Sequence, residues 1–144
     1  MSRTLYTKAY LFKGDKILLG KKRENRAWVC MGGKIYPSES VTEGIIRTVK
    51  KDIGFRPDMI YPRFSNSPLH AHRDLPLPVS IYESLEEDEK IVIEVVGKIK
   101  EGKHVNVDNE KFSDYGFFNI EDIDNNSFIP IDVREKAVRA HKMI

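Results

Sequence analysis

The residues with the clearest chemical potential lie in one stretch, Gly32 to Phe55, which reads GGKIYPSESVTEGIIRTVKKDIGF. The pair Gly32 and Gly33 lets the backbone turn where a side chain would clash, and Pro37 and Ser38 continue the turn. A helix is expected to follow at once. Its free N–H groups and the positive end of its dipole would then converge beside the loop. The stretch therefore predicts a binding site for an anionic group.

The predicted helix covers about residues 40–53. Ser40 and Glu43 have the spacing of a helix-starting capping box, and Gly54 stands where a left-handed C-cap belongs. Pro57 prevents the helix from continuing. Apolar residues recur along one face of this helix, namely Val41, Ile45, Ile46, Val49 and Ile53. That face is expected to pack against the rest of the protein.

A histidine pair followed by arginine lies in the proline-rich segment 61–78. His70 and His72 could act as bases near neutral pH, and Arg73 could bind a phosphate or a carboxylate. An H-x-H pair on a strand would also suit a metal, but a third ligand is not evident at a convincing spacing. Loops of this length are uncommon unless they are functional or disordered. The segment is therefore a candidate substrate-binding loop.

The basic loop 20–27 carries a second pair of candidate ligands. Arg23 and Arg26 are predicted to contact phosphate, with a solvated basic loop as the alternative. Trp28 is expected to belong to the core rather than to stack on a base. The single cysteine, Cys30, excludes an internal disulfide and fits a reducing compartment. We expect it to be a buried structural thiol.

The order of the elements that must position these residues predicts an α+β fold. The last helix is expected to begin at Asp132, with Glu135 completing a capping box, and the acidic run 86–89 is interpreted as a solvated hairpin tip. A helical turn is expected at 119–124. Strand patterns appear at residues 3–12, 16–19, 28–31, 58–64, 78–83, 91–99 and 115–118.

Length and composition narrow the class of protein. The 144 residues predict a single domain, 1–144, and the 40% hydrophobic and 32% charged residues exclude a disordered chain. The net charge of +2, from 24 basic and 22 acidic residues, is too small to predict binding to nucleic acid or to a membrane. No apolar run approaches membrane-spanning length, so a cytoplasmic protein is expected. The oligomeric state stays open, with a homodimer as one option.

The stretch 32–55 resembles the Nudix box, G-x5-E-x7-R-E-U-x-E-E-x-G-U, in which U is aliphatic. Gly33, Glu39, Arg47, Val49 and Gly54 match in register. The resemblance extends over roughly residues 4–142, although only the box is specific. It implies an α/β/α sandwich with a mixed β-sheet between helices. It also implies a hydrolase that splits a diphosphate linked to another group with water and a divalent metal.

The box departs from the family pattern at its three central glutamates. Thr48, Lys51 and Asp52 stand there, so a single carboxylate remains. Lys51 would repel a cation, or would contact a phosphate in its place. Thr48 is interpreted as a surface filler. By the resemblance, Mg²⁺ or Mn²⁺ would be held weakly by Glu39 and Asp52.

Two more carboxylates are candidates for the same site. Glu43 is a candidate third metal ligand, with helix capping and pairing to Arg47 as the alternative. Some Nudix enzymes use a glutamate in the loop before the aromatic strand, and Glu110 occupies that position, with a solvated loop charge as the alternative. Glu39, Asp52 and Glu110 are thus the predicted catalytic residues.

Three functions follow from this pattern. The first is a Nudix-type hydrolase of a small nucleoside-diphosphate-linked compound, for example a sugar nucleotide. The second is a non-catalytic Nudix-fold module that binds such a nucleotide-type ligand, which the loss of two carboxylates and the presence of Lys51 favour. The third is an interaction domain with a filled pocket.

Overall fold

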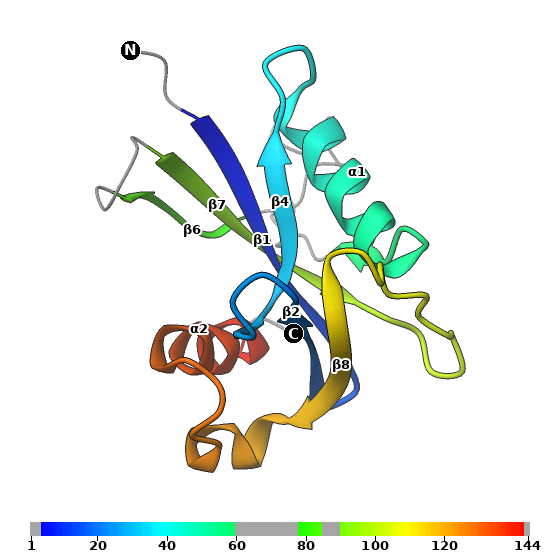
Figure 1. Cartoon of the computed structure of the whole chain (residues 1–144), viewed down its shortest axis with the longest axis vertical. Helices are drawn as coiled ribbons and strands as arrows, with labels where there is room; N and C mark the ends of the chain where they lie inside the picture. Colours follow the sequence, from blue (N-terminus) through cyan, green and yellow to red (C-terminus); the bar gives the residue numbers. More distant parts are fainter. Residues whose placement is uncertain (1–3, 60–77, 85–89, 143–144) are drawn as a thin grey trace, which may run out of the picture.

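The computed structural model describes residues 4–59, 78–84 and 90–142 of the chain. These residues form one eight-stranded sheet with helices beside it (Figure 1). The helical elements are α1 (Val41–Ile53), the 3₁₀ segment η2 (Ile120–Asn125) and α2 (Ile131–His141). The strands are β1 (Thr4–Lys13), β2 (Lys16–Lys22), β3 (Trp28–Val29), β4 (Met31–Ile35), β5 (Asp58–Met59), β6 (Pro78–Ser84), β7 (Lys90–Lys98) and β8 (Phe112–Asn119).

The sheet is mixed, as predicted. Its main path is β3-β2-β1-β7-β5, and β4, β6 and β8 pair with β1, β7 and β2 respectively. β1 and β7 run parallel, in register from Thr4 opposite Lys90 to Phe12 opposite Lys98. The other pairs are antiparallel, including the predicted β6–β7 pair and the β1–β2 hairpin. The strand expected at 28–31 is instead divided, because β3 pairs with β2 whereas β4 pairs with β1.

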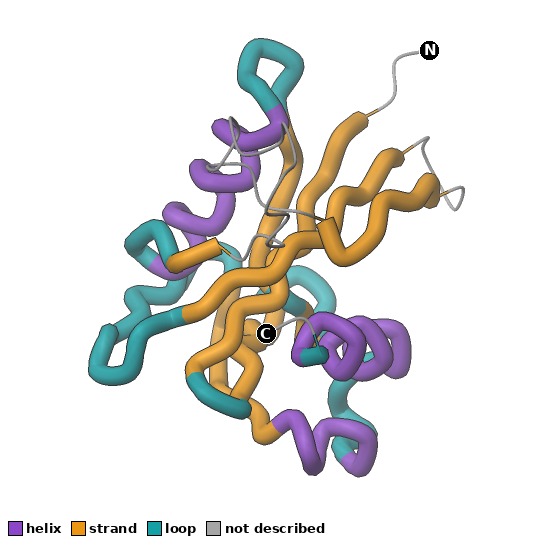
Figure 2. Tube along the Cα trace, turned by 180° about the vertical axis from the view of Figure 1, so that it is seen from behind, coloured by secondary structure: helices purple, strands orange, loops and turns teal. Residues whose placement is uncertain are grey.

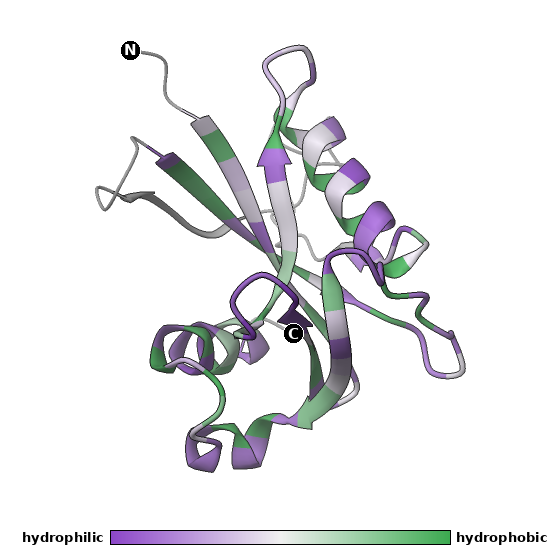
Figure 3. Ribbon diagram, in the orientation of Figure 1, coloured by the Kyte–Doolittle hydropathy of each residue, from purple (hydrophilic) through white to green (hydrophobic). Residues whose placement is uncertain are grey.

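Helices α1 and α2 lie on opposite sides of the sheet, so the fold is an α/β/α sandwich (Figures 1 and 2). Alternation along β1 explains the two cores, because successive side chains of a strand point to opposite faces. Ala9 and Leu11 belong to the core beneath α1, whereas Tyr10 and Phe12 belong to the core beneath α2. Figure 3 shows hydrophilic and hydrophobic residues alternating along both helices, as expected for helices with one face on a sheet.

Helix α1 has the predicted ends. The Ser40 hydroxyl accepts the Glu43 N–H at 3.1 Å, and Gly54 adopts the left-handed conformation, with φ 89°, that closes the helix. Ile45, Val49 and Ile53 are buried in the core between α1 and the sheet. Because these residues pack against the sheet, the polar side of α1 faces away from this core.

Helix α2 begins differently from the prediction. It starts at Ile131, with Pro130 as N-cap and no capping side chain, so the capping box predicted at Asp132 is wrong. The fixed φ of a proline is compatible with a helix start, and this lets the first turn form one residue early. Ala137 is buried in the core, and His141 lies against Phe12 with ring centroids 5.5 Å apart. Neither α1 nor α2 is long and apolar enough to span a membrane.

Two predictions about core residues are confirmed. Trp28 packs edge-on against Phe118, with ring centroids 5.1 Å apart, in the core beneath α2. Cys30 is buried in the same core, and burial raises the pKa of its thiol to about 12. A neutral, enclosed thiol has a structural role. The expected acidic hairpin tip 86–89 lies outside the described residues.

Candidate functional site

The glycine pair lies within β4, opposite Lys8 and Thr7 of β1, so the turn predicted at this pair is wrong. A close backbone approach is what requires glycine here. Gly32 has φ 129°, and a Cβ on it would lie 2.1 Å from the carbonyl oxygen of Thr7 in β1. A Cβ on Gly33 would instead make ordinary contact, 3.5 Å from Thr48 Cγ2. The two glycines therefore have different roles. Gly32 allows β4 to lie close to β1, whereas Gly33 lines the cleft beside α1.

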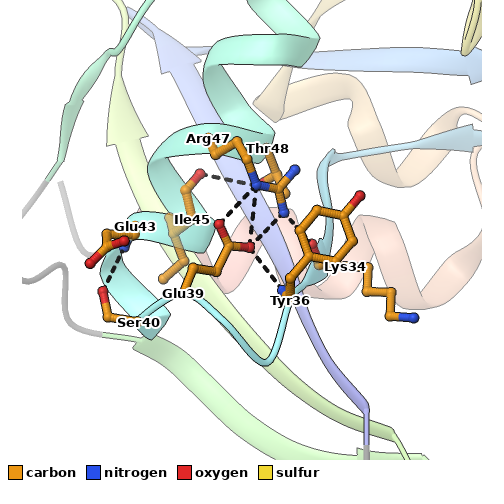
Figure 4. Close-up of polar contacts among 8 residues, drawn as sticks. All are labelled: Lys34, Tyr36, Glu39, Ser40, Glu43, Ile45, Arg47 and Thr48. Atoms are coloured by element: carbon orange, nitrogen blue, oxygen red, sulfur yellow. Dashed lines mark hydrogen bonds and ion pairs between the residues drawn. The ribbon is translucent and has the colours of Figure 1, made fainter.

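Glu39 and Arg47 close the loop between β4 and α1 (Figure 4). Arg47 Nη2 donates to Glu39 Oε1 at 2.7 Å, and Arg47 Nε donates to Glu39 Oε2 at 2.9 Å. Arg47 Nη2 also donates to the carbonyl of Lys34 at 2.7 Å, and its guanidinium lies 4.2 Å from the centre of the Tyr36 ring. The Tyr36 N–H donates to Glu39 Oε1 at 2.8 Å. The loop is thus held by a two-point ion pair.

Both oxygens of the predicted ligand Glu39 are therefore engaged within the protein. The hydrogen bonds from Arg47 and the Tyr36 N–H lower the pKa of Glu39 to about 2. A metal would have to compete with the guanidinium for this carboxylate. Glu39 is the counter-ion of Arg47 in this loop, and its role as a metal ligand stays a prediction.

The Glu39–Arg47 pair predicts a specific acid response. A lowered pKa adds stability above the ordinary value of 4.5, and that stability is lost as the pH falls toward about 2. We expect Arg47→Gln to reduce stability near neutral pH, and the gap to wild type to shrink as the pH falls from 4.5. Urea unfolding at several pH values, with exposed Arg139→Gln as the control, measures the gap. A measured pKa near 4.5 for the Glu39 carboxyl in the wild-type protein would contradict this prediction.

Asp52, near the end of α1, is buried, with 2% of its surface exposed. Its Oδ2 accepts the Gly32 N–H at 2.9 Å, and Lys111 Nζ lies 3.0 and 3.1 Å from its two oxygens. The same ammonium donates to the Gly32 carbonyl. Burial raises the pKa of Asp52, while the positive charge of Lys111 and the Gly32 N–H oppose the rise. Asp52 therefore joins α1, β4 and the loop before β8.

Lys111 is a site residue that sequence reasoning missed. It lies in the loop before β8, next to the predicted residue Glu110, and its side chain is 30% exposed. Backbone bonds hold this loop beside the end of α1, since Asn106 N donates to Ile53 O and Asp108 N to Asp52 O, both at 2.9 Å. The resemblance that placed Glu110 in the loop beside the box also places the next residue, Lys111, in that loop.

A cleft of about 400 Å³ lies between the glycine pair of β4, α1 and the loop before β8. The predicted residues Lys51 and Glu110 line it, as do Asp52, Arg47 and Lys111. Thr48 also lines the cleft, but it is 5% exposed and its hydroxyl donates to Ile45 O at 3.0 Å. The interpretation of Thr48 as a surface filler is wrong, because its methyl group packs beside Gly33.

Other predicted residues lie apart from this cleft. Glu43 is exposed at the start of α1, where Figure 4 shows it beside Ser40, and Arg47 pairs with Glu39 instead. Arg23 Nε donates to the Asn109 carbonyl, so Arg23 supports the loop before β8. Arg26 is exposed, with φ 60°. The remaining predicted ligands, His70, His72 and Arg73, lie outside the described residues.

A second cavity, of about 470 Å³, adjoins the first. The two cavities share Gly32, Gly33 and Lys111. The second one continues along β1 and β4 to the start of α2. Cationic and aromatic side chains contribute to its lining, including Tyr6, Lys8, Lys22 and Lys90. The Lys90 ammonium lies 4.9 Å from the centre of the Tyr6 ring.

The described residues do not form a donor set that fits a divalent metal. Within residues 4–59, 78–84 and 90–142, no group of three or more His, Cys, Asp or Glu side chains is arranged to hold one. Mg²⁺ prefers several oxygen ligands in near-octahedral geometry. Glu39 is engaged by Arg47, and Asp52 by Lys111. The predicted set of Glu39, Glu43 and Asp52 is not brought together here as a cluster.

The α/β/α sandwich, with the Glu39–Arg47 clamp on the loop before α1 and an open cleft beside that helix, is the arrangement of a Nudix-fold domain. The sequence model described as NUDIX domain matches residues 3–138, so the chain belongs to the Nudix family. A comparison with curated proteins gave no match. The resemblance noted in the sequence is thereby confirmed, and so is the fold.

Solved structures share this fold at low sequence identity. A NUDIX-family hydrolase from Clostridium perfringens has a TM-score of 0.81 and 18% identity, covering 99% of this chain and 98% of that chain. A MutT NUDIX hydrolase from Burkholderia pseudomallei has a TM-score of 0.71 and 13% identity, covering 96% and 98%. An ADP-ribose pyrophosphatase from Streptococcus suis has a TM-score of 0.65 and 18% identity, covering 98% and 93%.

Proposed function

We propose that this Nudix domain binds a small nucleoside-diphosphate-type compound, such as a sugar nucleotide, without metal-dependent hydrolysis. The observation that carries the proposal is the pair of adjoining cavities that meet at Gly32, Gly33 and Lys111. Each has a volume in the range of small-molecule sites, about 300–1,000 Å³. A two-part cavity with a cationic junction matches a ligand that has a central diphosphate and a group on each side.

Charge and ring chemistry support this ligand class. Lys51 and Lys111 line the first cavity beside three carboxylates, and their ammonium groups can contact phosphate oxygens. Tyr6 gives the second an aromatic surface on which a base or a sugar can pack. Two structural neighbours are named for compounds of this kind, the ADP-ribose pyrophosphatase and a UDP-X diphosphatase with a TM-score of 0.65.

Hydrolysis of the same class of compound is the second candidate function. It is favoured by the three carboxylates that line the first cavity, Asp52, Asp108 and Glu110. It requires Mg²⁺ or Mn²⁺, which the described donor set does not fit. We therefore place binding ahead of catalysis. If the domain only binds its ligand, removal of metal should leave binding unchanged. If it is a hydrolase, removal of metal should abolish product formation.

Isothermal titration calorimetry with ADP-ribose, a UDP-sugar, ADP and adenosine tests the proposal. Each compound is titrated in EDTA and again with Mg²⁺ or Mn²⁺, and the mixtures are then analysed by chromatography for products. We expect a diphosphate compound to bind in EDTA and to be recovered intact. Turnover that depends on metal and is lost in Asp52→Ala would favour the hydrolase. Failure of every diphosphate compound to bind would overturn the proposed ligand class.

A further inference from the structure

The Lys111 ammonium lies where the two cavities meet. It is in contact with three oxygens, the two of Asp52 and the carbonyl of Gly32, and its residue lines both cavities. Its side chain is nevertheless 30% exposed, whereas Asp52 is 3% exposed on the side chain. Lys111 is thus partly open beside the cavities, whereas its partner Asp52 is enclosed by protein.

The hydrogen-bond capacity of the ammonium determines which contact a ligand must displace. An ammonium has three N–H donors, and three oxygens lie within their reach here, two from Asp52 and one from the Gly32 carbonyl. A phosphate oxygen can therefore accept from Lys111 in place of one Asp52 oxygen, while the other Asp52 oxygen and the Gly32 carbonyl stay bound. The backbone on either side is held in place, because Phe112 is buried and its N–H donates to the Asp108 carbonyl at 3.0 Å.

A divalent cation would compete for the same oxygens. Asp52 is the carboxylate that remains from the central glutamates of the box, and Lys111 already neutralises it. Two positive charges a few Å apart repel, so metal entry would require Lys111 to move away from both partners. Thr48 offers a hydroxyl that already donates to Ile45 O. The charge that a metal would supply is thus already present as a side chain.

We propose that Lys111 is a built-in cation of this site. Asp52 and the Gly32 carbonyl position its ammonium, which contacts the diphosphate of the ligand directly and makes binding independent of divalent metal. The inference rests on the proposed function and adds to it the residue that recognises the anion. Lys111 is then the specificity-determining residue for phosphate, and Asp52 is a positioning residue.

The test compares Lys111→Gln with Lys100→Gln, using ADP-ribose and inorganic diphosphate as probes in calorimetry. Glutamine keeps an N–H donor for Asp52 but has no charge, and Lys100 is exposed and lines neither cavity. We expect Kd for both probes to rise roughly tenfold or more in Lys111→Gln and to stay within about twofold in Lys100→Gln. Equal effects in the two variants would overturn the role of Lys111.

Measurements on the wild type alone keep the inference testable if Lys111→Gln folds poorly. The Kd for ADP-ribose should agree within about twofold between EDTA and Mg²⁺, and electron paramagnetic resonance should show Mn²⁺ remaining free. Stoichiometric Mn²⁺ uptake, or binding of the probe only with metal, would overturn the inference while leaving the ligand class intact. Absence of probe binding under all conditions would instead overturn the proposed function.

Discussion

Gly32→Ala is expected to lower the free energy of unfolding by about 3 kcal/mol or more. The added Cβ would lie 2.1 Å from the Thr7 carbonyl oxygen, and the backbone φ of 129° disfavours any residue with a side chain. Relief would require β4 to move away from β1, to which it is paired from Leu5 to Ala9. Urea unfolding followed by the fluorescence of Trp28, the single tryptophan, measures the change.

Gly33→Ala is the matched control for this substitution. Its Cβ would be in ordinary contact with Thr48, at 3.5 Å, and we expect a cost of about 1 kcal/mol or less. Equal losses in the two variants would mean that β4 tolerates displacement from β1. Gly32→Ala should also weaken ligand binding more than Gly33→Ala, because displacement of β4 from β1 would alter both cavities that Gly32 lines.

Asp52→Ala is expected to cost about 2–4 kcal/mol of stability and to weaken binding of the diphosphate ligand. Its removal leaves the Gly32 N–H without its acceptor at 2.9 Å and the Lys111 ammonium without its counter-ion. The 30% exposure of Lys111 keeps the cost below that of a fully buried pair, because water can solvate part of the charge. Unfolding in urea and calorimetry with ADP-ribose report the two effects.

A double-mutant cycle separates the ion pair from the other contacts of Asp52. We expect Asp52→Ala combined with Lys111→Met to be more stable than the sum of the single effects predicts, with a coupling of about 1–3 kcal/mol. Thermal unfolding of the four proteins gives this value. Additive effects would show that the pair contributes little and that the Gly32 hydrogen bond carries most of the cost.

The framework of the site could be predicted because it depends on local sequence. Ser40 and Gly54 determine where α1 begins and ends, and apolar residues at four-residue spacing determine the face that it buries. The continuous apolar run 9–12 in β1 likewise indicates a strand that is buried on both faces. Each of these features depends on residues within one helix or strand, or at its ends, so it can be predicted from the local sequence.

The charges inside the site could not be predicted in the same way. Asp52 and Lys111 are separated by 59 positions, and their contact depends on how the loop before β8 packs beside α1. The sequence therefore suggested Lys51 as the cation near the missing glutamates, whereas the structure places Lys111 on Asp52 and leaves Lys51 exposed at the cleft. Similarly, Arg47 could have paired with Glu43 or Glu39, and only the loop geometry selects Glu39.

The position of Gly32 has a consequence for the energetics of binding. Its N–H donates to Asp52 and its carbonyl accepts from Lys111, so both backbone polar groups of this residue are satisfied before any ligand arrives. A strand segment held in this way does not need a metal or a phosphate to become ordered. Little conformational entropy is then lost when a ligand enters, and the free and bound proteins are expected to share one backbone conformation around the glycine pair.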